Sequence, residues 1–78
     1  MTVSFRDTVF YFMRLFVNGE TFETAGAETI ADLLQELGIE EGRVAVEVNL
    51  SIAKKAEYPT FRLRDDDRVE IINFVGGG

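Results

Sequence analysis

Cysteine, histidine and tryptophan are absent from this 78-residue chain, and proline occurs once. Without cysteine or histidine the chain can form no disulfide, no Cys–His or Ser–His–Asp nucleophile system and no standard zinc site. A chain of this length is expected to form one domain, with little room for a deep pocket beside its core. We therefore expect a protein that is not an enzyme and binds no metal or cofactor, with a core of Leu, Ile, Val and Phe.

Basic residues are also scarce, since eight Lys and Arg stand against fourteen Asp and Glu, for a formal net charge of −6. This charge repels nucleic-acid phosphates and anionic membrane surfaces, so a basic protein is the more plausible partner. No apolar stretch is long enough to cross a bilayer. Residues 1–12 mix charges with a short apolar run, which does not fit a signal peptide. The sequence thus predicts a cytoplasmic protein with neither nucleic acid nor membrane as partner.

A β-hairpin is predicted at residues 13–24. The β-prone runs Met13–Val17 and Glu20–Thr24 flank Asn18-Gly19. Asn-Gly between two such runs is a strong hairpin signal, because both central residues must adopt positive φ.

A capped helix is predicted next. Thr29 can accept a hydrogen bond from the amide of Asp32, whose carboxylate can reach back and also suits the positive helix end. Gly38 is placed to end the helix in the left-handed conformation. The apolar residues recur at i, i+3, i+4 and i+7, as Ile30, Leu33, Leu34 and Leu37. This pattern predicts about three turns with one buried face.

The second half of the chain is richer in strands. Val44–Val48 alternates valine with other residues, which predicts a strand with its valine face inward. Residues 49–58 favour a short strand or an irregular crossover, with a single turn at 54–57 that ends before Pro59. Phe61 and Leu63 then predict another short strand.

Residues 65–67 predict a turn before the final strand, 68–74. This strand is apolar on both faces, which is typical of a central strand. With the helix packed on the sheet, the order predicts an α+β protein of the β-grasp (ubiquitin-like) type, with a mixed four- to five-stranded sheet on one main helix. We assign the β-grasp domain to residues 13–74. Residues 1–12 form an extension of unknown role, apolar enough to pack or to pair with a sheet edge.

The chain closes with Val75-Gly76-Gly77-Gly78, which we expect to be a flexible tail. Three glycines without Cβ atoms can thread a narrow channel in a partner, and residues 75–78 can reach about 13 Å beyond the last strand. The alternative is a frayed end or a cloning remnant. The glycines follow a core strand without the polar spacer of a linker, which favours a functional tail.

Residues 13–78 resemble the ThiS family of sulfur carriers for thiamin thiazole synthesis. Four segments carry the resemblance: MRLFVNGE at 13–20, TIADLL at 29–34, VAVEVN at 44–49 and DRVEIINFVGGG at 67–78. β-Grasp strands and Gly-Gly ends are each widespread. Their joint occurrence, in this order and at this length, is much more specific.

The resemblance implies a carrier on which partner enzymes act. An E1-like enzyme would use Mg-ATP to adenylate the carboxylate of Gly78, with Gly76 and Gly77 as the threaded neck. A persulfide donor such as a cysteine desulfurase would then leave a thiocarboxylate on Gly78. Thiazole synthase would take the sulfur from it.

Such partners need a docking surface beside the tail. The apolar candidates are Phe16, Ile72, Phe74 and Val75. Exposed apolar groups near a functional tail often mark an interface. The alternative is that the crossover or Tyr58 covers these side chains.

Three other functions stay open on the sequence. The small subunit of molybdopterin synthase is also a β-grasp sulfur carrier, but its tail usually follows proline-containing sequence rather than Asn73-Phe74-Val75. A ubiquitin-like modifier would form isopeptide bonds to lysines. In a plain interaction module, the tail would be incidental.

Overall fold

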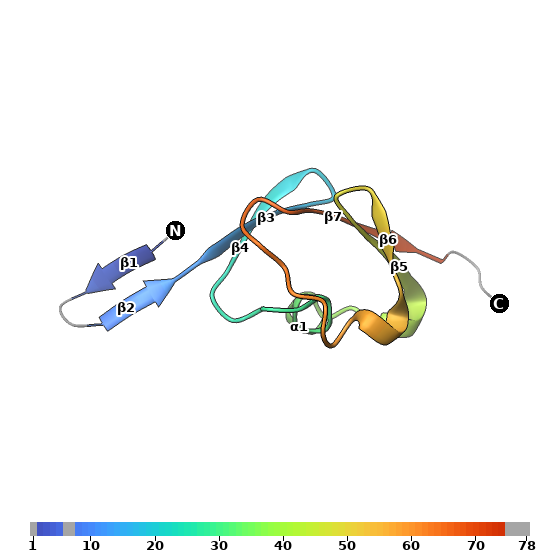
Figure 1. The fold of residues 1–78 in the computed structure, drawn as a ribbon, viewed down its shortest axis with the longest axis horizontal. Coiled ribbons are helices and arrows are strands. Elements are labelled where there is room, and N and C mark those ends of the chain that lie inside the picture. The colour runs from blue at the N-terminus through green and yellow to red at the C-terminus, as the bar shows by residue number, and fades with distance from the viewer. Residues whose placement is uncertain (1, 6–7, 75–78) are drawn as a thin grey trace.

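The computed structural model describes residues 2–5 and 8–74. Within these residues, five strands form one sheet over a single α-helix, α1 (Figure 1). In chain order the sheet strands and α1 are β3 Met13–Val17, β4 Glu20–Thr24, α1 Ile30–Leu37, β5 Val44–Val48, β6 Ser51–Ala53 and β7 Arg68–Asn73. Two short 3₁₀ helices are η1 Glu41–Arg43 and η2 Lys55–Glu57.

The strand order in the sheet is β4-β3-β7-β5-β6. β3 and β7 run parallel, and the other neighbouring strands run antiparallel. The final strand therefore lies in the centre, beside the first strand of the hairpin, as its apolar residues on both faces predicted. The mixed sheet on one helix confirms the β-grasp prediction.

Residues of the N-terminal extension form a separate two-stranded sheet. β1 Thr2–Phe5 pairs antiparallel with β2 Thr8–Tyr11. The pair lies beyond the start of β3 (Figure 1). These strands hydrogen-bond to each other rather than to an edge of the five-stranded sheet.

The hairpin and the helix caps follow their local sequence signals. Asn18 and Gly19 adopt positive φ, 50° and 83°. Thr29 Oγ1 accepts from the Asp32 amide at 3.2 Å, and the Asp32 carboxylate accepts from the Thr29 amide at 3.1 Å. Hydrogen bonds to Asp32 from the amides of Glu28 and Thr29 lower its pKa. Gly38 ends α1 at φ 72°, as predicted, and the eight residues of the helix make about two turns rather than the expected three.

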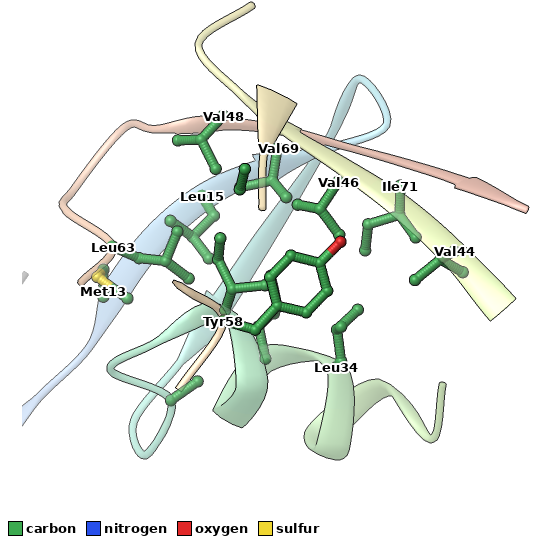
Figure 2. Close-up of a cluster of buried hydrophobic side chains, with 14 residues drawn as sticks. Met13, Leu15, Leu34, Val44, Val46, Val48, Tyr58, Leu63, Val69 and Ile71 are labelled. Carbon is green, nitrogen blue, oxygen red and sulfur yellow. The ribbon is translucent and has the colours of Figure 1, made fainter. Parts of the chain in front are cut away.

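The core lies between α1 and the inner face of the sheet (Figure 2). The helix contributes Ile30, Leu33 and Leu34, all fully buried, whereas Leu37 is half-buried. The ring of Tyr58 fills the space between the helix and the sheet and is 1% exposed. The inner face of the sheet contributes Met13, Leu15, Val44, Val46, Val48, Ala53, Val69 and Ile71.

The prediction of a strand at Phe61 and Leu63 is wrong. The backbone of this segment bonds to the start of the helix instead of to the sheet. The Ile30 amide donates to the Phe61 carbonyl at 3.2 Å, and the Leu63 amide donates to the Glu28 carbonyl at 2.9 Å. Only an isolated bridge, Thr29 with Arg62, resembles strand pairing. The segment is extended because it spans the edge of the core, with Leu63 buried against it.

Candidate functional site

The central strand β7 carries the chain to the predicted functional tail. Val69 and Ile71 anchor β7 in the core, while Ile72 is exposed on the opposite face. Beyond the strand, the Phe74 amide donates to the Arg43 carbonyl at 2.9 Å. Backbone bonds thus fix the direction of the chain up to residue 74. The predicted tail residues Val75, Gly76, Gly77 and Gly78 lie outside the described residues.

Asn18 holds the same end of β7 through its side chain. Its backbone amide donates to the Val69 carbonyl at 2.8 Å. Its side-chain Oδ1 accepts from the Ile71 amide at 2.7 Å, and its Nδ2 donates to the Ile71 carbonyl at 3.3 Å. The carboxamide therefore bonds to β7 as a strand peptide would, at the point where the backbone of β3 has already turned away. The sequence predicts only a role in the turn for Asn18, and the local sequence carries no signal for its side-chain bonds to β7.

Asn18→Gly is expected to loosen β7 near its end. Glycine keeps the positive φ of the turn but removes both side-chain bonds, so the free energy of unfolding should fall by about 1–3 kcal/mol. The Ile71 amide should also exchange with deuterium faster than this global loss explains. Hydrogen exchange read residue by residue by NMR checks this.

Asn49→Gly is the matched control. Asn49 also has positive φ, and its side chain bonds to the other end of β7, accepting from the Arg68 amide at 2.9 Å. This change should accelerate deuterium exchange at the Arg68 amide. Exchange at the Ile71 amide should change only by the amount that the global loss of stability explains. Equal exchange rates at Ile71 in both variants would show that Asn18 has no local hold on the strand.

The structure separates the predicted docking residues into two groups. Ile72 and Phe74 are 48% and 58% exposed, with the Lys55 ammonium 5.5 Å from the centre of the Phe74 ring. Phe16 is half-buried on the same sheet face, opposite Arg68. Its position is therefore offset by four residues from Ile72, about 13 Å along the strands.

The Phe16 side chain does not form a plain apolar surface, because two cationic side chains lie against its ring. Its ring lies 5.5 Å from the Arg14 guanidinium and 5.4 Å from that of Arg68. The alternative role of Tyr58 as a cover for Ile72 and Phe74 does not hold, because Tyr58 is buried on the helix side of the sheet.

The acidic turn at 65–67 serves the fold at the start of β7. Asp66 pairs with Arg14 at 2.7 Å, and Asp65 accepts from the Arg14 amide at 3.0 Å. Asp67 accepts from the Arg64 amide and from the Asn49 side chain. No group of acidic residues in the described part of the chain has the geometry of a metal site. Nor is any described helix long and apolar enough to cross a membrane.

Comparison with known sequences points to one family. A model of the ThiS family matches residues 15–78. The sulfur carrier protein ThiS of Bacillus subtilis is 46% identical over 50 residues, which cover 64% of this chain and 76% of that protein. The ThiS of Thermus thermophilus is 36% identical over 64 residues, 82% of this chain and 98% of that protein.

A thiazole synthase of Paramagnetospirillum magneticum is also similar, 42% identical over 66 residues. The match covers 85% of this chain, which spans only 20% of the length of that relative. Among solved structures, the crystal structure of the thiamine biosynthesis protein ThiS from Geobacter metallireducens is similar, with a TM-score of 0.72 at 33% identity. The match covers 85% of this chain and all of that one. The chain therefore belongs to the ThiS family.

Proposed function

We propose that this protein is a sulfur carrier for thiazole formation in thiamin biosynthesis, and that the carboxylate of Gly78 carries the sulfur. The observation that supports this most is the extent of the family match, which continues through the glycines to residue 78. The central position of β7 adds support, because a strand held on both sides can present the residues that follow it in a constant direction.

In the first proposed step, an E1-like enzyme activates Gly78. A free carboxylate is a poor electrophile, so one of its oxygens attacks the α-phosphorus of Mg-ATP and pyrophosphate leaves. The product is an acyl-adenylate, in which AMP is a good leaving group. The carrier contributes the carboxylate and its presentation, whereas the partner binds ATP and Mg.

In the second proposed step, the terminal sulfur of a partner's cysteine persulfide attacks the acyl carbon and displaces AMP. A second thiol then attacks the inner sulfur of the acyl persulfide. This breaks the S–S bond, forms a disulfide on the partner and leaves a thiocarboxylate on Gly78. The carrier has no cysteine, so every thiol that takes part in these reaction steps must come from partner proteins. We propose a cysteine desulfurase as the class of sulfur donor.

Thiazole synthase is the proposed acceptor of the sulfur. Two proteins named thiazole synthase, from Paramagnetospirillum magneticum and Magnetococcus marinus, contain a segment similar to this chain. A carrier segment and a synthase within one polypeptide would raise the local concentration of each for the other. We infer that the separate carrier serves the same class of enzyme.

Intact mass spectrometry of the protein from its native host tests the proposal. Exchange of one carboxylate oxygen for sulfur should add about 16 Da. Fragmentation should place the added mass on Gly78. A population with no added mass under thiamin starvation, or with the mass on another residue, would contradict the proposal.

A further inference from the structure

Two glutamates face each other on the outer side of the sheet. Glu47 on β5 lies opposite Glu70 on β7, and on its other side Glu47 lies opposite Ile52 of β6. The intervening residues of β5 and β7 point into the core, so alternation along the strands directs both carboxylates away from α1. Like charges at directly opposite positions destabilise a strand pair.

Neither glutamate has a cationic partner within the described residues. The ion pairs found there join Arg14 to Asp66, Arg43 to Glu40 and Arg62 to Glu28. The nearest arginine on the same face of β7 is Arg68, and its guanidinium lies over the Phe16 ring.

The two glutamates differ in burial. This residue is half-buried, whereas Glu70 is exposed. Neither side chain takes part in a hydrogen bond found among the described residues. The register therefore places two carboxylates at directly opposite positions in the middle of the sheet, without a cationic partner among the described residues.

Exposed apolar side chains surround this pair. Ile52 is 75% exposed and Ile72 is 48% exposed, on the two sides of β5. In the turn between β5 and β6, Leu50 is 87% exposed and adopts φ 72°, a conformation unusual for leucine. A carboxylate pair amid exposed apolar groups is complementary to a cationic side chain set in an apolar surface.

We propose that this surface (Glu47, Ile52, Glu70 and Ile72, the acidic docking face) binds the adenylating partner through a Lys or Arg side chain that contacts both carboxylates. The inference rests on the proposed function and names the surface through which the partner recognises the carrier. A cation between the carboxylates would relieve their repulsion, and Ile52 and Ile72 would pack against the apolar surface around it. β7 carries Glu70 and Ile72 and leads to the tail, so docking here fixes the reach of Gly78. Gly78 follows Ile72 by six positions, so a fully extended chain could reach about 20 Å from Ile72.

The double variant Glu47→Gln/Glu70→Gln tests this inference. With the E1-like enzyme from the same genome, ATP–pyrophosphate exchange should show a KM for the carrier raised about tenfold at low salt, with kcat within about twofold. Increasing salt should raise the KM of the wild type more than that of the variant. Because repulsion is removed, the Tm of the variant alone should rise by about 1–5 °C.

Glu20→Gln/Glu36→Gln is the matched control, since it changes the net charge equally. Glu20 lies on the edge strand β4 and Glu36 on α1, away from the acidic docking face. A glutamine at position 36 keeps an oxygen that can accept from the Thr24 hydroxyl, as Glu36 does at 2.6 Å. This variant should keep a KM within about twofold of the wild type.

Equal KM values in the two double variants, or a fall in Tm for Glu47→Gln/Glu70→Gln, would overturn the inference. Wild-type carrier that is never adenylated would instead contradict the proposed function. Titration of each carrier variant into the same enzyme without ATP then tests whether the acidic docking face binds that enzyme. A Kd about tenfold weaker for Glu47→Gln/Glu70→Gln than for the control would support it, and equal Kd values would refute it.

Discussion

Deletion of Gly78 is expected to reduce adenylation of the carrier by at least about 100-fold while its Tm stays within about 1 °C of the wild type. The shortened chain still ends in a glycine carboxylate, but that carboxylate falls about 3.5 Å short of its place in the partner's active site. A displacement of even 1 Å can cost about 100-fold in rate. ATP–pyrophosphate exchange and a thermal melt measure the two effects.

The expected separation of activity from stability follows from the chemistry of glycine, which has no side chain to bury in the core. Within the described residues, the last core residue is Ile71, seven positions before Gly78. Gly78→Ala is a useful companion, because it keeps the length and adds one methyl group to the part proposed to be threaded. Wild-type adenylation of the shortened protein, or a Tm lower by more than about 4 °C, would contradict the assignment of Gly78.

Elements fixed by local chemistry could be predicted from the sequence. Asn18-Gly19 sets the turn, and the structure gives both flanking strands the predicted bounds. The Thr29–Asp32 capping box and Gly38 likewise mark the helix ends by bonds within a few residues. Both predicted ends of the helix are confirmed, but the eight residues between them make about two turns, so the prediction of three turns was wrong.

Elements fixed by distant partners could not be predicted. Phe61 and Leu63 alternate as strand residues do, but the backbone of this segment bonds to the start of α1, about thirty positions earlier in the chain. The core role of Tyr58 was missed for the same reason. A single aromatic residue before a proline gives no periodic signal, although its side chain closes the space between helix and sheet.

In the candidate site, too, some features follow from the local sequence and others depend on distant parts of the chain. Ile72 and Phe74 could be named from the sequence, because alternation along β7 places apolar residues on both faces. The opposition of Glu47 to Glu70 depends on the register between β5 and β7, which are separated by about twenty residues. The bonds from Asn18 to Ile71 depend on the parallel pairing of the first and last sheet strands. The geometry that presents the tail is therefore set by tertiary pairing.

Tyr58→Ala is expected to lower the free energy of unfolding by about 3–5 kcal/mol, the cost of removing a large buried side chain. The ring is 1% exposed and packs between α1 and the sheet, and burial raises the pKa of its hydroxyl. A domain of this length has a total stability of roughly 4–12 kcal/mol. The substitution should leave a substantial unfolded fraction at 37 °C, and urea unfolding followed by circular dichroism measures it.

Two companion variants locate the source of this loss. Tyr58→Phe keeps the ring and removes the hydroxyl, so it should cost about 1 kcal/mol. Phe74→Ala truncates an aromatic ring that is 58% exposed, and it should cost less than about 0.5 kcal/mol. Near-equal losses for Tyr58→Ala and Phe74→Ala would place Tyr58 outside the core. The expected order instead means that Tyr58 stabilises the sheet from the helix side, so that the opposite face and the end of β7 remain open to a partner.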